Sequence, residues 1–264
     1  MVSKSNGGLV MAEEQKQEFK FPTETVDLPS EGKLYPKDSP LSSGKIEIKY
    51  MTAREEDILT SQNLIKKGIV IDKLLDSLIL TKGVTSNDLV LGDKNAVMVA
   101  ARVLAYGPEY ECEVVIPQSG EKVHRSFDLT DCPFKKIPDE ITENNFSITL
   151  PACNKEINFR ILTGKEEKLV TQELDAIKKK VGSLVSPELT TRLKKAITAV
   201  DGDDKQITIN SFVDNMLSRD SMVLRAKMNE VAPDIDLEQE IEVGGESVTV
   251  TIPMTVNFFW PKAK

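Results

Sequence analysis

The fold of this chain is decided by the stretch Val26-Asp-Leu-Pro-Ser-Glu-Gly-Lys-Leu-Tyr-Pro36 and by the segment that follows it. Proline fixes φ and glycine permits backbone conformations that strain other residues, so Pro29, Gly32 and Pro36 predict an extended segment rich in turns. Its apolar residues indicate that it lies against a protein surface, and they are Leu28, Leu34 and Tyr35. None of these residues is arranged for chemistry, and the pattern favours a segment that docks onto protein.

A strand and a helix are expected directly after this segment. Ile46 and Ile48 alternate with charged residues, as they do in a half-buried strand. Thr52 followed three residues later by Glu55 forms the capping-box pattern that begins a helix, and Gly68 is placed to end it.

Composition and charge exclude several classes of protein. The 264 residues carry a formal net charge of −8, which opposes contact with nucleic acid or with an anionic membrane surface. The longest apolar run is too short to span a membrane, and the N-terminal residues lack the apolar core of a signal peptide. Without a secretion signal, the three cysteines are expected to be reduced thiols in a cytosolic compartment.

Helical and strand patterns alternate in blocks along the chain. The expected helices lie at 52–67, 71–79, 93–106, 163–181, 187–200, 210–217 and 221–228, with Asp93 capping the third and Ser186 preceding the fifth. The expected hairpins pair 110–116 with 122–129, 146–150 with 156–162, and 237–243 with 246–252. Segregated blocks of helices and strands predict an α+β fold, with helical bundles set apart from antiparallel hairpins.

The order of these blocks predicts two similar halves, each with helices followed by a hairpin. Residues 1–25 are polar, lack periodicity and are expected to form a flexible arm. Residues 26–135 hold Leu28–Pro36, which we call the docking segment, followed by the first helices and the first long hairpin. Residues 136–264 form a second α+β half with a C-terminal hairpin and an aromatic tail, and the prolines Pro133 and Pro138 mark the connector between the halves.

Candidate catalytic and metal-binding residues are few. His124 is the single histidine, and no Gly-x-Ser-x-Gly elbow occurs, so a solvent-facing strand residue is favoured over a catalytic base. Cys112, Cys132 and Cys153 are too far apart for the paired ligands of structural zinc. Asp201-Gly-Asp-Asp204 lacks the later glycine and glutamate of a calcium loop and indicates an acidic turn. We therefore predict no catalytic residue, no metal and no cofactor.

The C-terminal stretch is more informative. It holds the single tryptophan beside two phenylalanines and a proline: Phe258, Phe259, Trp260 and Pro261. Aromatic residues fill pockets and dominate interface energetics, so this tail either packs back into the body or anchors in a partner.

The order of short motifs resembles the baseplate hub protein family of T-even-type contractile-tail bacteriophages. The motifs are Leu28–Pro36, Met51–Thr60, Lys67-Gly68, Gly92-Asp93, Ala101-Arg102, Tyr106–Tyr110, Phe127–Leu129 and Phe258–Pro261. The resemblance covers most of residues 26–261. Many relatives in that family carry Cys-x-x-Cys-Gly knuckles at two hairpin turns, where this chain has Ile116–Gly120 and Val243–Gly245, so a zinc role is not expected here.

The resemblance implies a non-enzymatic hub subunit that is needed for baseplate and tail assembly through protein–protein contacts. Its partners would be other hub proteins and the tape-measure protein, and its location the virion baseplate, with assembly in the host cytoplasm. Two alternatives stay open: a transient assembly chaperone that is absent from the mature virion, and a hydrolase using His124 and a carboxylate. The expected interface residues are Leu28, Pro29, Leu34, Tyr35, Pro36, Phe258, Phe259, Trp260 and Pro261.

Overall fold

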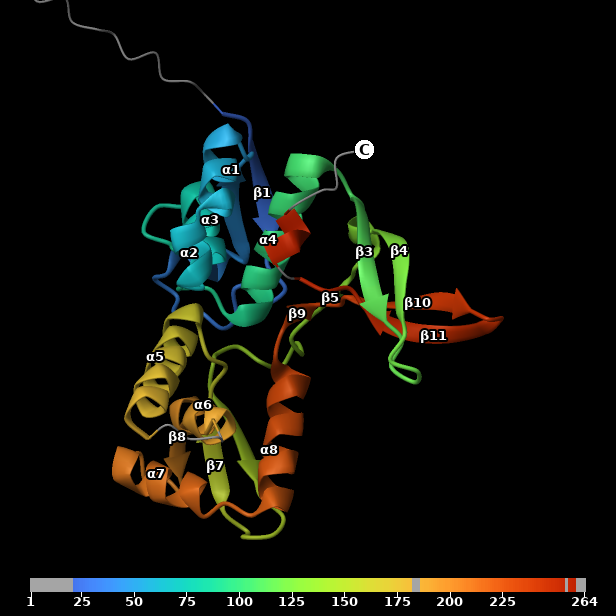
Figure 1. Cartoon of the computed structure of the whole chain (residues 1–264). Coiled ribbons are helices and arrows are strands. Elements are labelled where there is room, and N and C mark those ends of the chain that lie inside the picture. Colours follow the sequence, from blue (N-terminus) through green and yellow to red (C-terminus); the bar gives the residue numbers. More distant parts are fainter. Residues whose placement is uncertain (1–20, 182–185, 255, 260–264) are drawn as a thin grey trace, which may run out of the picture.

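The computed structural model describes residues 21–181, 186–254 and 256–259, and it has an α+β fold, as predicted. Three groups of elements are visible in Figure 1: helices α1–α4 with strands β1 and β2, helices α5–α8 with strands β6–β8, and the hairpins β3–β4 and β10–β11. Residues 1–25 were predicted to form an arm, and residues 1–20 of that arm lie outside the described residues.

The first group begins with an antiparallel pair, β1 (Thr23–Asp27) and β2 (Lys45–Lys49), joined by the docking segment and the short 3-10 helix η1 (Pro40–Ser43). The helices that follow are α1 (Ala53–Thr60), α2 (Gln62–Lys66), α3 (Val70–Leu78) and α4 (Leu91–Tyr106). The capping box of Thr52 and Glu55 is present. The single helix predicted over 52–67 is broken at Ser61, whose extended ψ of 104° interrupts the helical path.

The second group holds β6 (Phe146–Thr149), β7 (Glu156–Phe159), β8 (Ile197–Val200) and the helices α5 (Gly164–Val181), α6 (Glu188–Ala196), α7 (Gln206–Asp214) and α8 (Ser218–Val231). The helix predicted over 187–200 ends at Ala196, and the prediction was wrong for its last four residues. Ile197–Val200 instead pairs with β7 as the third strand of a sheet. Ile197 and Val200 share a helical spacing with Leu193, but the β-branched segment gains more by completing the sheet.

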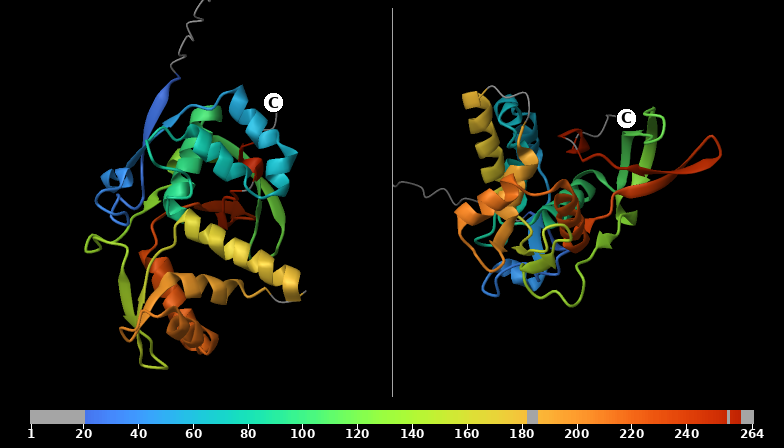
Figure 2. Two further views of the ribbon diagram at one scale, coloured as in Figure 1. Left: turned by 90° about the vertical axis from the view of Figure 1, so that its left-hand side faces the viewer. Right: turned by 90° about the horizontal axis from the view of Figure 1, so that it is seen from below.

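The long hairpins lie together on one side of the molecule. They are formed by β3 (Glu109–Val115) with β4 (Lys122–Asp128), and by β10 (Glu238–Val243) with β11 (Glu246–Thr251). A short pair, β5 (Phe134–Lys135) with β9 (Asp234–Ile235), joins the two halves of the chain, next to the 3-10 turn η2 (Leu129–Asp131). The right-hand view of Figure 2 shows both hairpins extending away from the helices.

The two halves resemble one another in sequence and in the order of several of their elements. Residues Ile46–Leu59 align without a gap with Ile157–Val170, and the identical pairs are Ile46/Ile157, Thr52/Thr163, Glu55/Glu166 and Glu56/Glu167. The aligned residues make the same contacts. Lys49 pairs with Glu55 at 2.7 Å, and Arg160 pairs with Glu166.

The helices α4 and α8 are the second aligned region of this repeat. Asp93 and Asp220 both occupy the third position of their helix, and both helices lead to a proline that precedes a strand, Pro108 and Pro233. The β1–β2 unit in the first half thus corresponds to β6–β7 in the second, and hairpin β3–β4 corresponds to β10–β11.

The C-terminal segment returns to the first half of the chain. The 3-10 helix η3 (Val256–Phe259) lies beside α4 in Figure 1. Phe258 and Phe259 are fully buried, and the Phe258 ring contacts Tyr110 edge-on, with ring centroids 4.9 Å apart. Residues assigned to the second half therefore complete the core of the first.

Candidate functional site at the α4 junction

The docking segment is fixed by a buried carboxylate at the start of α4. The backbone N–H of Ser30 donates to Asp93 Oδ1 at 2.9 Å, and the Ser30 hydroxyl donates to Asp93 Oδ2 at 2.6 Å. The Tyr35 hydroxyl also donates to Oδ2 at 2.6 Å and accepts from the N–H of Val90 at 3.0 Å. Asp93 was predicted to cap α4 from outside the helix, and that prediction was wrong, because Val90 precedes the helix and Asp93 is its third residue.

Burial dominates the electrostatics of this cluster. Removal from water raises the pKa of Asp93 against the lowering effect of its hydrogen bonds from Ser30 and Tyr35. Burial, followed by the neighbouring Asp93 carboxylate, also raises the pKa of Tyr35, so the phenol stays protonated and can donate. The cluster is therefore a closed hydrogen-bonded network without a group poised for proton transfer to a ligand.

Two further segments meet α4 at the same end. A Cβ on Gly92 would lie 1.9 Å from the carbonyl oxygen of Pro233, so only glycine permits this approach. The N–H of Gly164, at the start of α5, donates to the Leu89 carbonyl oxygen at 2.8 Å. The first turn of α4 and the residues directly before it thus contact the docking segment, the start of α5 and the segment after α8, and they join the two halves.

An equivalent carboxylate holds the β6–β7 turn of the second half. Asp220 of α8 accepts from the N–H groups of Ala152 at 2.8 Å and Cys153 at 3.1 Å. Ala152 corresponds to Ser30 in the repeat, since both follow a Leu-Pro pair. Burial acts to raise the pKa of Asp220, but the N–H groups of Ala152 and Cys153, the Cys153 thiol and the charge of Arg219 together outweigh it, and the pKa is lowered. The sequence analysis predicted two similar halves but did not align them residue by residue, and it therefore missed this cluster.

The residues expected to contact a partner lie mostly inside the chain itself. Leu28, Leu34 and Tyr35 are at most 9% exposed, Pro29 is buried, and Phe258 and Phe259 are fully buried. Pro36 is exposed. Trp260 and Pro261 lie outside the described residues. The two phenylalanines of the aromatic tail pack back into the body of the protein, which is one of the two alternatives stated for this tail.

Arg102 of α4 anchors the C-terminal segment. Its Nε donates to the Phe258 carbonyl oxygen at 3.0 Å, and its terminal nitrogens donate to the carbonyl oxygens of Gly107 and Glu109 at 2.9 and 3.2 Å. Arg102 is 3% exposed, so this buried guanidinium is satisfied by backbone acceptors. Two motifs singled out in the sequence, Ala101-Arg102 and Phe258–Pro261, therefore meet in space.

The candidate catalytic and metal-binding residues stay separate. His124 is exposed on β4, where its Nε2 lies 3.9 Å from a Glu113 carboxylate oxygen. Cys112 is buried, and burial raises its pKa to about 11, which keeps the thiol protonated near neutral pH. Asp201–Asp204 forms a turn that follows β8. Within the described residues, no three acidic, histidine or cysteine side chains gather as a metal site, and no helix is long and apolar enough to cross a membrane.

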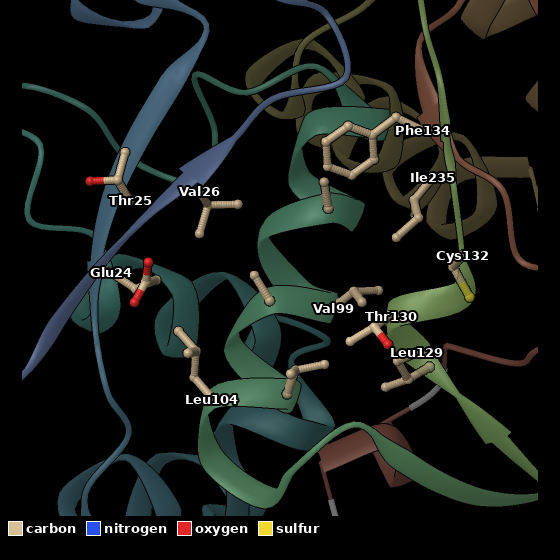
Figure 3. A pocket seen from close by; sticks show the side chains of 13 residues that line it. Glu24, Thr25, Val26, Val99, Leu104, Leu129, Thr130, Cys132, Phe134 and Ile235 are labelled. Atoms are coloured by element: carbon tan, nitrogen blue, oxygen red, sulfur yellow. The ribbon is translucent and has the colours of Figure 1, made fainter.

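One open cavity is largely apolar. It has a volume of about 450 Å³ and lies between β1, the outer face of α4 and the segment that runs from η2 to β5 (Figure 3). We call it the β1–α4 groove. Its lining consists of Glu24, Thr25, Val26, Ala96, Val99, Ala100, Val103, Leu104, Leu129, Thr130, Cys132, Phe134 and Ile235.

These features define an α+β protein with two similar halves, in which Asp93, Arg102 and Phe258 join segments of the same chain. The described residues also form an open apolar groove and two projecting hairpins. Residues 21–260 match the family described as T4 bacteriophage base plate protein, and the chain belongs to that family. No curated protein and no solved structure matches the chain. The protein is thus a structural protein of the phage baseplate, and other baseplate proteins are its partners.

Proposed function

We propose that this protein is a subunit of the baseplate hub and is required for baseplate and tail assembly through protein–protein contacts, without enzymatic activity. Family membership over residues 21–260 carries this proposal. Its location would be the tail baseplate of the virion, after assembly in the host cytoplasm. The partners would be other hub proteins and the tape-measure protein.

The projecting hairpins support a role in binding protein. A two-stranded hairpin is marginally stable by itself, and β3–β4 and β10–β11 rely on packing against each other. Glutamates alternate along the outward positions of β3 and β10: Glu109, Glu111, Glu113, Glu238, Glu240 and Glu242. Such acidic strands resist edge-to-edge aggregation. Glu113 already pairs with Lys122 at 2.8 Å, so it is mainly the glutamates of β10 that favour a partner with a basic face.

Deletion of the gene from the phage, combined with quantitative mass spectrometry of purified virions, tests the proposal. Deletion is expected to stop baseplate formation, and wild-type virions are expected to contain the protein at a stoichiometric copy number. A protein that assembly requires but that mature virions lack would instead be a transient chaperone for the hub or the tape-measure protein. Normal tails without the protein would overturn both alternatives. The hydrolase alternative depends on His124. Since we propose a protein without enzymatic activity, a His124→Ala phage is expected to be fully functional, and loss of function in that phage would favour the hydrolase.

A further inference from the structure

The β1–α4 groove has a free strand edge along one wall. β1 belongs to a two-stranded sheet in which β2 is its one neighbour among the described strands. The N–H of Tyr50 donates to the Pro22 carbonyl oxygen, and the N–H of Leu28 donates to the Gly44 carbonyl oxygen. In this antiparallel pair, every second residue of the strand makes the hydrogen bonds to its neighbour. The backbone N–H and C=O groups of residues 24 and 26 therefore point toward β2. Those of Thr25 point to the opposite edge of β1.

The repeat provides an internal control for the groove. Counting from Asp93 and Asp220, Ala100 and Val103 of α4 correspond to Lys227 and Glu230 of α8. Lys227 and Glu230 form an ion pair at 2.8 Å, as expected for a helix face that meets water. The same face of α4 is apolar, with Val99 buried and Ala100, Val103 and Leu104 half-buried. The fold alone does not require an apolar surface here, so this surface indicates an occupant.

Acidic residues lie near the end of the groove that Cys132 lines. Cys132 lines the groove, and its pKa is raised by burial and by the nearby carboxylates of Asp236, Asp131 and Asp128. The neighbouring cations face other partners, since the Lys135 ammonium donates to the Asn229 carbonyl oxygen and Lys136 pairs with Glu31 at 3.1 Å. An occupant with basic residues at this end would therefore be favoured.

We propose that the β1–α4 groove binds an extended segment of another baseplate protein, which adds as a third strand to the free edge of β1. The segment inserts alternate apolar side chains between Val26, Val99 and Phe134, and it carries basic residues toward Asp128, Asp131 and Asp236. In strand addition, main-chain hydrogen bonds supply affinity and the pockets select the side chains. This inference rests on the proposed function, because it assigns the surface through which the subunit meets a neighbour.

The test uses 15-residue peptides that tile the other baseplate proteins of the same phage, each titrated against the full-length protein. A peptide with alternating apolar residues and a basic flank is expected to bind, to bind less tightly as salt rises, and to slow amide exchange at Thr25. The double variant Ala100→Lys/Val103→Glu gives the groove the ion pair of α8, and binding is expected to fall at least tenfold. The matched control is Lys227→Ala/Glu230→Val, which is expected to bind normally.

A second variant addresses the strand edge without changing the apolar lining. Thr25→Pro removes the outward N–H, and proline is tolerated on an edge strand, so the same loss of binding is expected while the melting temperature is retained. The proposal would be overturned if no peptide binds, if binding survives both variants, or if slowed exchange lies away from β1. It would also be overturned if deletion of residues 1–20 raises peptide affinity tenfold, which would make the arm the occupant. A dimer that the double variant abolishes would make a second copy the occupant.

The groove and the proposed function can fail separately. Virions that incorporate the Ala100→Lys/Val103→Glu protein at wild-type copy number would reject the groove and leave the hub role intact. A groove that binds a baseplate peptide in a protein absent from virions would support the groove and reject the subunit role.

Discussion

Asp93 and Asp220 show how one residue type acts differently in two copies of one motif. Each is the third residue of its helix and holds a turn of the preceding strand pair. Asp93 accepts two hydroxyl donors and one backbone donor in a site where burial raises its pKa. Asp220 has backbone donors that act together with the Cys153 thiol and Arg219 to outweigh burial and lower its pKa. The two carboxylates are therefore expected to affect stability in opposite senses as pH changes.

Asp93→Asn is expected to destabilise the protein by about 1–3 kcal/mol at neutral pH, because the amide replaces one acceptor oxygen with an NH2 donor and cannot accept all three hydrogen bonds. Since the pKa of Asp93 is raised on folding, the folded state binds more protons than the unfolded state between the two pKa values. The stabilisation that this extra proton gives the folded state is fully present below the ordinary pKa of about 3.9. It is lost as pH rises through the raised pKa. The difference in unfolding free energy between wild type and variant should thus widen as pH falls toward about 4.

Asp220→Asn serves as the comparison in the same urea titrations. Because the pKa of Asp220 is lowered on folding, its contribution is present above the ordinary pKa and is lost as pH falls through the lowered one. The difference between wild type and this variant should narrow below about pH 4. Parallel pH profiles for the two variants would contradict the assigned electrostatics.

Lys49→Met should be far more harmful than the equivalent change in the second half, Arg160→Met. The side chain of Glu55 is 1% exposed, and removing Lys49 leaves a buried carboxylate without its cation, a loss of about 3 kcal/mol. In the second pair Arg160 is 43% exposed and Glu166 is 16% exposed, so this pair is better solvated than Lys49–Glu55 and should contribute about 1 kcal/mol. Chemical denaturation of both variants measures the difference, and equal losses would contradict it.

The interface residues show where sequence analysis stops at the residue scale. The apolar character of Leu34 and Tyr35 correctly indicated burial against protein, but an apolar side chain does not specify whose surface covers it. The partner of Tyr35 is Asp93, 58 positions away. Alanine at Leu34 and Tyr35 should therefore destabilise the fold, because both residues are buried in the core.

Among the elements, the junction of α4 with the end of α8 depends on Gly92. A Cβ there would collide with the Pro233 carbonyl oxygen at 1.9 Å, so Gly92→Ala must separate the two segments. We expect a loss of about 1–3 kcal/mol, although alanine favours the helix itself. The corresponding residue of α8 is Arg219, which is exposed, and Arg219→Ala should change stability by less than about 0.5 kcal/mol. Thermal unfolding compares the two, and an unchanged Gly92→Ala protein would rule out the close approach.

Elements with local signals were predictable from the sequence. The long hairpins β3–β4 and β10–β11 match their alternating patterns to within two residues, because alternation and turn residues are both encoded nearby. β8 was not predictable in this way, since Ile197–Val200 becomes a strand through pairing with β7, about 40 residues earlier. The β1–α4 groove was equally hidden, because its walls come from segments more than 200 residues apart.

At the scale of the whole molecule, the two repeats are interlocked. β5 pairs with β9, Gly164 bonds to Leu89, and the C-terminal η3 packs on α4, so each half contributes to the core of the other. The boundary between the two halves, placed between residues 135 and 136 from the sequence, stays a prediction. These contacts nonetheless imply that stability is shared across the division, and the tail provides the sharpest test of that coupling.

Phe258→Ala should destabilise the first half of the chain although the residue belongs to the C-terminal tail. The ring is fully buried against Tyr110 and Phe259, and truncation of such a ring costs about 3–5 kcal/mol. Amide exchange is expected to accelerate in α4, whose Arg102 bonds to the Phe258 carbonyl, and to change less in α7, which lies in the other half. Trp260→Ala tests the same tail beyond the described residues: a retained melting temperature with loss of incorporation into virions would assign the tryptophan to a partner. Acceleration confined to η3 in the Phe258→Ala protein would show that the tail is an appendage and that the two halves are stable independently.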